Sequence, residues 1–359
     1  MSHPNFTPGD FVLPAEWEPQ SGIQLTWPHA DTDWKPYLDD ITATFIEMTR
    51  TIARYEPVLI VTPQPHIVAE TLRSHIDEAA LRNVRFYAME TNDTWARDHG
   101  AITLTARKAM DREAPAHRLL DFKFNGWGEK FAWEKDNRIT GQLNAQGVFA
   151  GTVESHDDLV LEGGSIESDG RGTVFTTSQC LLAPHRNQPL SQAQIEEQLR
   201  RRLHAERIVW LDHGNLIGDD TDGHIDTIVR LAPDDTLLYI GCDDMNDEQF
   251  EDFNALEQQL KQLKTADGRP YRLLRLPMPT AIYDDGERLP ATYANFVIMN
   301  GAVMVPTYEQ PEKDQEALRT IGLAFPGRDI IGVDSRTVIR QHGSLHCLTM
   351  QFPEGALAL

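Results

Sequence analysis

The sequence has few cysteines, and their spacing does not pair them. Its 359 residues include three cysteines, Cys180, Cys242 and Cys347. An odd count without paired spacing excludes the disulfide framework that is typical of small secreted proteins. Residues 1–19 also lack the basic and apolar regions of a secretory signal peptide. We therefore expect a reducing environment and predict a cytoplasmic protein.

Positive charge is scarce as well. Lys and Arg number 33 against 55 Asp and Glu, which gives a formal net charge of −22. This balance argues against nucleic acid and anionic membrane surfaces as partners, and no apolar run approaches the length of a transmembrane helix. It favours a cationic small molecule, although acidity that only supports solubility is the simpler explanation of the charge taken alone. The charge therefore ranks the classes of function without deciding among them.

Several common catalytic motifs are missing from the sequence. There is no glycine-rich phosphate loop ending in Lys-Ser/Thr, no Gly-x-Ser-x-Gly nucleophile elbow and no His-Glu-x-x-His zinc helix. These absences leave the chemistry to residues that are far apart along the chain.

Helical and strand patterns alternate along the chain. Apolar residues at helical spacing precede short apolar runs five times, an alternation that predicts an α/β fold. No segment reads as an interdomain hinge, so we predict one large domain over residues 1–359. The five predicted helix–strand pairs cover residues 38–52 and 58–61, 67–80 and 84–87, 191–203 and 208–210, 250–263 and 271–274, and 312–323 and 330–333.

A base and a carboxylate stand two residues apart in the middle of the chain. His224 and Asp226 begin a segment, residues 224–231, that we predict as a strand, so both side chains point to the same face. They could therefore meet one substrate. A buried histidine that is satisfied by a neighbour is the ordinary alternative.

Two further carboxylates lie beside predicted strands. Asp98 follows Trp95, so the pair could grip a cation through charge-assisted hydrogen bonds and an aromatic wall. An ion pair between Arg97 and Asp98 is an equally good interpretation. Glu162 follows an apolar run and precedes two glycines, where it could orient a histidine or lie in a solvated turn.

Cys347 stands near the C-terminus, at the start of an alternating stretch that we predict as a strand over residues 346–352. A free cysteine is by default a small buried apolar side chain, and Cys180 and Cys242 fit that default better. With His224 and the three carboxylates, however, Cys347 forms a set suited to attack on a cationic, electron-poor carbon.

A metal site is the other hypothesis that these residues allow. Asp212 and His213 lie upstream of His224 and Asp226, and the four side chains could together hold the metal of a metal-dependent hydrolase.

Six motifs in this order resemble the agmatine deiminase family, which also includes the Porphyromonas-type peptidyl-arginine deiminases. The resemblance runs from Pro14 to about Pro353. The motifs are PAEWEP at 14–19, DTWARD at 93–98, FNGWG at 124–128, LEGG at 161–164, GHID at 223–226 and LHC at 345–347.

The resemblance implies a guanidino-group-modifying enzyme with a pentein fold, an α/β propeller of five ββαβ-like units with pseudo-fivefold symmetry. It implies that Cys347 is the nucleophile, His224 the general acid and base, Asp98 and Asp226 the guanidinium-binding carboxylates, and Glu162 a support for His224. Trp95 would lie at the substrate site. It implies no metal and no organic cofactor.

The expected reaction is hydrolysis of agmatine to N-carbamoylputrescine and ammonia. Deimination of peptidyl-arginine and non-catalytic binding of a guanidine remain as alternatives, and assembly into a homo-oligomer stays open. The sequence departs from the usual family pattern at His99-Gly100-Ala101, Asn125-Gly126-Trp127 and His342-Gly343-Ser344. These departures leave the catalytic set intact and bear on the choice of guanidine.

Overall fold

The chain folds into an α/β structure, as the alternating pattern predicted. The computed structural model describes residues 10–107 and 116–359, so the first half of the 1–19 segment lies outside the described residues. Within the described part, none of the helices combines the length and the apolar character that a membrane crossing requires.

Five sheets in the described residues repeat one topology. In each, an antiparallel pair of strands is followed by a parallel strand, which the chain reaches through at least one helix. A separate hairpin joins β14 (Tyr283–Asp284) to β15 (Glu287–Arg288). In sheet order, the five sheets are β19 (Thr349–Pro353), β2 (Gln20–Thr26), β3 (Val58–Thr62) and β4 (Val84–Ala88); β1 (Phe11–Val12), β5 (Ile102–Ala106), β6 (His117–Lys123) and β7 (Thr152–Val160); β8 (Ile166–Ser168), β9 (Thr173–Thr177) and β10 (Arg207–Leu211); β11 (Val229–Ala232), β12 (Thr236–Gly241) and β13 (Arg272–Pro277); and β16 (Val297–Met299), β17 (Ala302–Thr307) and β18 (Asp329–Asp334).

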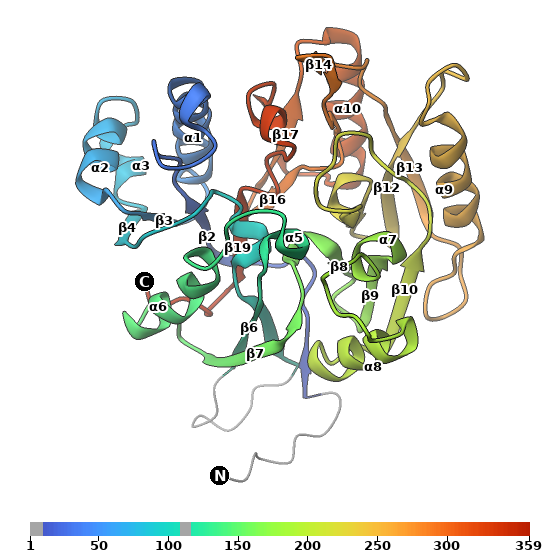
Figure 1. The fold of residues 1–359 in the computed structure, drawn as a ribbon, viewed down its shortest axis with the longest axis horizontal. Coiled ribbons are helices and arrows are strands. Elements are labelled where there is room, and N and C mark those ends of the chain that lie inside the picture. The colour runs from blue at the N-terminus through green and yellow to red at the C-terminus, as the bar shows by residue number, and fades with distance from the viewer. Residues whose placement is uncertain (1–9, 108–115) are drawn as a thin grey trace.

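The longer helices lie toward the outside of the molecule and the sheets toward its middle (Figure 1). The α-helices are α1 (Leu38–Ile52), α2 (Pro65–Arg73), α3 (Glu78–Leu81), α4 (Ala96–His99), α5 (Gly126–Glu129), α6 (Ile139–Ala145), α7 (Ser178–Leu181), α8 (Gln192–Arg202), α9 (Phe250–Gln262) and α10 (Pro311–Ala324). The 3₁₀ helices are η1 (Lys35–Tyr37), η2 (Asp136–Arg138), η3 (Gly163–Ser165), η4 (Ile225–Thr227) and η5 (Val338–Gln341).

All five predicted helix–strand pairs are present, with one helix divided. The helix predicted over residues 67–80 is two helices, α2 and α3. The side chain of Asp77 accepts a hydrogen bond of 2.8 Å from the backbone N–H of Ala80, so it caps a new helix rather than continuing the first.

The pairs do not fall one to a sheet, however. Two of them, α1 with β3 and α2–α3 with β4, share a single sheet. The crossover between β6 and β7 was not predicted, because its longest α-helix, α6, has only seven residues and too few turns to show a helical period.

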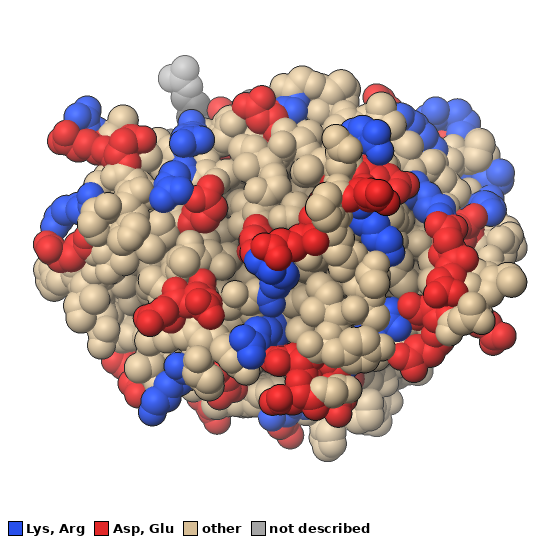
Figure 2. All heavy atoms as spheres, turned by 90° about the horizontal axis from the view of Figure 1, so that it is seen from above, with Lys and Arg blue, Asp and Glu red and all other residues tan. Residues whose placement is uncertain are grey.

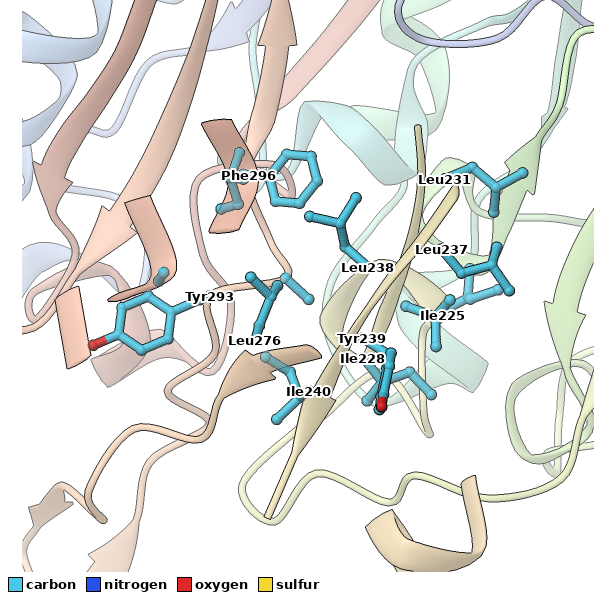
Figure 3. Close-up of a cluster of buried hydrophobic side chains, with 14 of the residues drawn as sticks. Ile225, Ile228, Leu231, Leu237, Leu238, Tyr239, Ile240, Leu276, Tyr293 and Phe296 are labelled. Carbon is cyan, nitrogen blue, oxygen red and sulfur yellow. The ribbon is translucent and has the colours of Figure 1, made fainter. Parts of the chain in front are cut away.

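A buried hydrophobic cluster, which includes residues of β11 and β12, anchors the segment that carries His224 and Asp226. Ile225, which stands between them, is fully buried and points into this cluster with Ile228 and side chains of β12 (Figure 3). Full burial of such a side chain contributes about 1.5–3 kcal/mol. The packing of Ile225 therefore fixes the residues on either side of it.

The acidic side chains are distributed rather than concentrated. Figure 2 shows separate groups of Asp and Glu across one face, with Lys and Arg between them. Many acidic side chains form surface ion pairs, such as Glu70 with Arg73 and Asp334 with Arg336. The net charge of −22 belongs to the whole sequence, and on the face shown the acidic side chains are spread over several groups rather than gathered in one patch.

Candidate active site

Cys347 lies in a turn that precedes β19. The strand predicted over residues 346–352 begins only at Thr349, because residues 345–348 turn instead of extending. The thiol is almost fully buried, with its Sγ 3.4 Å from Asn295 Oδ1 and 3.9 Å from Asp226 Oδ2. Burial, and then the negative charges of Asp226 and Asp98, raise the pKa of this thiol well above its usual range.

His224 lies immediately before a 3₁₀ turn and Asp226 lies within it, in place of the predicted strand. The strand predicted over residues 224–231 begins at Val229, and His224 immediately precedes η4. The Thr221 hydroxyl accepts the His224 backbone N–H at 3.1 Å, which holds the start of this turn. The argument that a strand places both side chains on one face was therefore wrong. Its conclusion, that the two side chains lie close together, is confirmed by the packing around Gly164.

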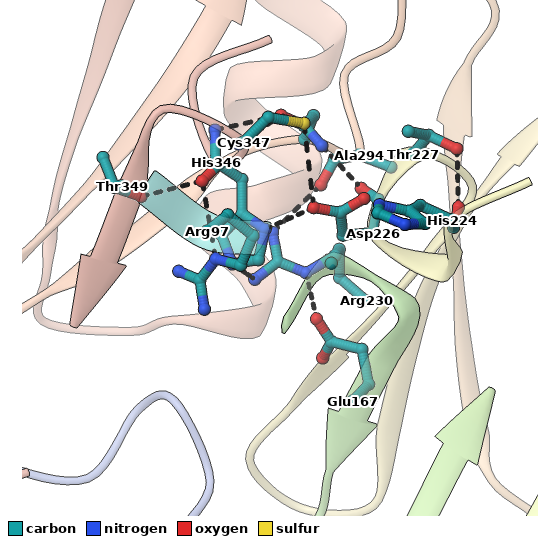
Figure 4. Close-up of polar contacts among 12 residues, drawn as sticks. Arg97, Glu167, His224, Asp226, Thr227, Arg230, Ala294, His346, Cys347 and Thr349 are labelled. Atoms are coloured by element: carbon teal, nitrogen blue, oxygen red, sulfur yellow. Dashed lines mark hydrogen bonds and ion pairs between the residues drawn. The ribbon is translucent and has the colours of Figure 1, made fainter. Parts of the chain in front are cut away.

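Gly164 marks the point where the site converges. A Cβ at this position would lie 2.6 Å from His224 Nδ1, 2.9 Å from Asp98 Oδ1 and 3.1 Å from Asp226 Oδ2. The second glycine after Glu162 is thus required because its missing side chain leaves room for three functional groups. Figure 4 shows Asp226 between the ring of His224 and the sulfur of Cys347.

Asp98 is buried and held by two donors. The indole N–H of Trp127 donates to Oδ2 at 3.0 Å, and the backbone N–H of Gly164 donates to Oδ1 at 3.1 Å. Burial raises the pKa of Asp98 to about 6, with His224 opposing and Asp226 and Glu162 adding to the rise. The alternative pairing of Arg97 with Asp98 is wrong, because the Arg97 guanidinium binds Glu16 at 3.0 Å.

Asp226 keeps one oxygen free for a ligand. Its Oδ2 lies 2.6 Å from His346 Nδ1, whereas its Oδ1 has no hydrogen-bond partner among the described residues. Burial alone would raise the pKa of Asp226, but the hydrogen bond and charge of His346, with His224 and Arg230, hold it below its usual value. Asp226 is therefore ionised at neutral pH.

An oxygen of Glu162 lies within 4.8 Å of a ring nitrogen of His224. One of its oxygens accepts the Arg186 Nε–H at 2.7 Å, and the solvated-turn alternative is wrong because the side chain is fully buried. Burial alone would lower the pKa of His224, but Asp98, Cys180 and Glu162 raise it well above its usual range. The imidazole is therefore poised to carry a proton.

Trp95 lines a pocket that opens from Cys347. The ring of Trp95 packs against the backbone of Gly343, where a Cβ would meet the ring at 2.2 Å. Trp95 and Asp98, which both line the pocket, provide the aromatic face and the carboxylate that a cation prefers. The pocket is lined by Asp33, Asp93, Trp95, Asp98, Trp127, Phe131, Asp220, Thr221, Gln341, His342, Gly343 and Cys347.

The donor set of the metal-hydrolase hypothesis is not brought together. His213 Nδ1 lies 3.2 Å from Asp252 on α9, with a side chain that is 43% exposed, unlike the fully buried His224. Among the residues that the structure describes, the groups of three or more metal-capable side chains include neither Asp212 nor His213.

Sequence reasoning gave no role to Asn295 or to the residues that hold Asp226. Asn295 Oδ1 accepts the backbone N–H of both His346 and Cys347, at 2.9 and 3.2 Å, so it fixes the turn that carries Cys347. His346 bridges Asp226 to Glu16, whose carboxylate lies 2.9 Å from its Nε2. Glu16 and His346 stand in two of the six motifs, whereas Asn295 carries no sequence signal.

The space at Gly164 yields a direct test. Gly164→Ala is expected to lower kcat/KM by about 10²-fold, because the added methyl group displaces His224 or a carboxylate from its working position. Gly141→Ala on α6 is the matched control, since no atom lies within 4 Å of its added Cβ. Steady-state kinetics on both variants check this, and equal rates for the two would contradict it.

Comparison with known proteins places the chain in a family. The model of the Porphyromonas-type peptidyl-arginine deiminase family matches residues 12–353. The chain belongs to this family. The match includes every candidate residue from Trp95 to Cys347, and it confirms the resemblance that the six motifs indicated.

Individual family members are similar to this chain over nearly their whole length. An agmatine deiminase of Pseudomonas aeruginosa is 32% identical over 98% of this chain and 99% of its own. The structure of a Porphyromonas gingivalis protein has a TM-score of 0.89 at 44% identity and covers 97% of this chain and 99% of its own. A substrate-bound cysteine-to-serine variant of C. jejuni agmatine deiminase has a TM-score of 0.87 at 35% identity, covering 96% and 97%.

Proposed function

We propose that this protein hydrolyses the guanidino group of agmatine, with N-carbamoylputrescine and ammonia as products. The observation that carries the proposal is the convergence of His224, Asp98 and Asp226 around Gly164. Cys347 lies beside Asp226, and Cys347 and Asp98 both line the pocket. Relatives that cover nearly the whole chain are agmatine deiminases, and one of their structures holds its substrate.

The guanidinium would bind between the two carboxylates. Asp98 and the free oxygen of Asp226 each accept N–H groups, which orients the group and balances its charge. This arrangement places the central carbon within reach of Cys347. The Trp95 ring then covers the cation at the wall of the pocket.

The reaction proceeds through a covalent intermediate. The Cys347 thiolate forms a C–S bond with the guanidinium carbon, and His224 gives a proton to the nitrogen that leaves as ammonia. An S-alkylthiouronium remains on Cys347. Water, deprotonated by the same His224, then adds to this carbon, and the C–S bond breaks to release the ureido product and the thiol. Glu162 holds His224 in its protonated form for the first step.

The pocket favours agmatine over substrates that carry a carboxylate. Asp33, Asp93 and Asp220 line it, and none of its described lining residues is Lys or Arg. Opposite charges attract the amino tail of agmatine, whereas the carboxylate of free arginine or of a C-terminal arginine is repelled. Peptidyl-arginine deimination is the second candidate, because the family model bears that description.

We propose further that residues 1–359 form a single catalytic domain and that its five sheets are the five ββαβ-like units of a pentein propeller. The repeated topology of the sheets supports this symmetry. Free, buried cysteines and the net charge of −22 support a cytoplasmic enzyme that acts on a small cation rather than on nucleic acid or membranes.

Ammonia release distinguishes the candidate functions. With agmatine, free arginine and a peptidyl-arginine as substrates, we expect agmatine to give the highest kcat/KM and chelator to cause no loss. Preference for the peptide would establish the second candidate. Binding of agmatine without ammonia would indicate a non-catalytic protein, and activity that chelator removes and zinc restores would indicate a metal-dependent hydrolase.

A further inference from the structure

The proposed mechanism leaves unused a second thiol beside His224. Cys180 lies on α7, where the Thr177 hydroxyl accepts its backbone N–H at 3.2 Å, and it is fully buried. Its sulfur, a nitrogen of His224 and an oxygen of Glu162 all lie within 4.8 Å of one another. Sequence reasoning treated Cys180 only as a small apolar side chain, yet α7 places it against the catalytic base.

Atoms that could bind a metal ion lie close together beside Cys180. Apart from the thiol of Cys180, neither ring nitrogen of His224 nor Oε2 of Glu162 has a hydrogen-bond partner among the described residues, although both side chains are fully buried. Buried polar atoms are nearly always paired, so unpaired atoms that converge are evidence of a missing ligand. The guanidinium is expected to bind Asp98 and Asp226, and it leaves the atoms facing Cys180 unsatisfied.

The surrounding charge suits a cation. Asp98, with its oxygen 3.6 Å from His224 Nδ1, and the buried Asp219 place negative charge around the cluster. Among the described residues, the Arg186 guanidinium, bound to Glu162 and Asp222, opposes this charge, and Lys130 also pairs with Asp222 at 2.9 Å.

We propose that Glu162, Cys180 and His224 form a binding site for zinc or a similar divalent cation, and that the bound cation inhibits the enzyme by taking His224 out of the reaction. One sulfur, one nitrogen and one oxygen donor are the set that zinc accepts, at about 2.0–2.3 Å from each. Donors within 4.8 Å of one another need to close by only about 1 Å to reach a tetrahedral arrangement. A fourth position stays open to water.

Binding is expected to release protons, because the cation requires Cys180 as a thiolate and His224 without its proton. Inhibition should therefore strengthen as pH rises. Inhibition can be measured only if the protein has the proposed function. Metal binding at the site is therefore tested first, by a measurement that needs no enzymatic activity.

Cobalt absorption tests the site directly. In the Cys347→Ser variant, added Co²⁺ is expected to give a sulfur-to-cobalt charge-transfer band in the near ultraviolet. The band should disappear in the Cys347→Ser/Cys180→Ser double variant and persist in the Cys347→Ser/Cys242→Ser control. A missing band in Cys347→Ser, or a band that survives removal of Cys180, would overturn the proposal whatever the enzyme's substrate.

Zinc inhibition is the second arm. In the wild-type enzyme, Zn²⁺ should suppress ammonia release from agmatine, and chelator should restore it. Cys180→Ala and Cys180→Ser, each compared with its own metal-free rate, should need at least about tenfold more zinc for half-inhibition, because losing a ligand costs at least as much affinity as losing an outer-shell partner. Unchanged zinc sensitivity in both variants would show that zinc acts at Cys347 and would refute the inhibitory role.

Discussion

Cys347→Ser is expected to lower ammonia release from agmatine on the order of 10⁶-fold, the scale for removal of the nucleophile from a covalent hydrolase. The serine hydroxyl has nearly the size of the thiol but is a far weaker nucleophile without an adjacent base. The thiol contacts Asn295 and Asp226, and none of its hydrogen bonds goes to His224 among the described residues. Single-turnover assays measure the loss, and calorimetry measures agmatine binding.

Binding should survive this substitution. Asp98, Asp226 and Trp95 remain in place, so the dissociation constant for agmatine should change little while turnover disappears. Cys242→Ser is the control, because Cys242 follows β12 and, among the described residues, its thiol hydrogen-bonds only to the Asp244 carbonyl, at 3.6 Å. Turnover in Cys347→Ser within tenfold of the wild type would refute the covalent mechanism.

The fold class could be predicted because apolar periodicity is a local property. Helices such as α1 and α10 have enough turns to display it, and the capping box of α8 at Ser191 and Gln194 is a local signal as well. The order of strands within a sheet is not local. That Thr349 pairs with Leu25 from the other end of the chain could not be read from either segment.

The candidate site residues could be chosen from the sequence because their chemistry is visible in their types, whereas the residues that hold them in place could not. Every predicted residue, from Trp95 to Cys347, lies at the pocket or beside His224. Asn295 acts through its position under the turn of Cys347, and Cys180 through its position beside His224. Such roles depend on which loops meet in space, and a single sequence does not encode that meeting as a local pattern.

Alkylation of Cys347 in the free enzyme by neutral chloroacetamide is expected to accelerate about tenfold per pH unit, or about 10³-fold between pH 6 and pH 9. Burial, and then the charges of Asp226 and Asp98, raise the pKa of the thiol well above its usual range, so the neutral thiol predominates throughout that interval. Because only the thiolate reacts, the rate follows its small, rising fraction. Mass spectrometry of the peptide that contains Cys347 measures this rate separately from the other two cysteines.

A cationic reagent of the same shape should behave differently. Chloroacetamidine replaces the amide oxygen by a charged nitrogen, so it binds Asp98 and Asp226 as the guanidinium does and offsets the two charges that disfavour the thiolate. We therefore expect it to react faster than chloroacetamide at pH 7 and to show a lower apparent pKa. An identical, near-neutral apparent pKa with both reagents, retained in His224→Asn, would show that the free enzyme already holds a thiolate. Activation by the substrate's own charge would then be refuted. A lower apparent pKa with chloroacetamidine than with chloroacetamide would explain how a pocket rich in carboxylates can use a thiol as its nucleophile. The cation that those carboxylates select would then be the group that creates the thiolate.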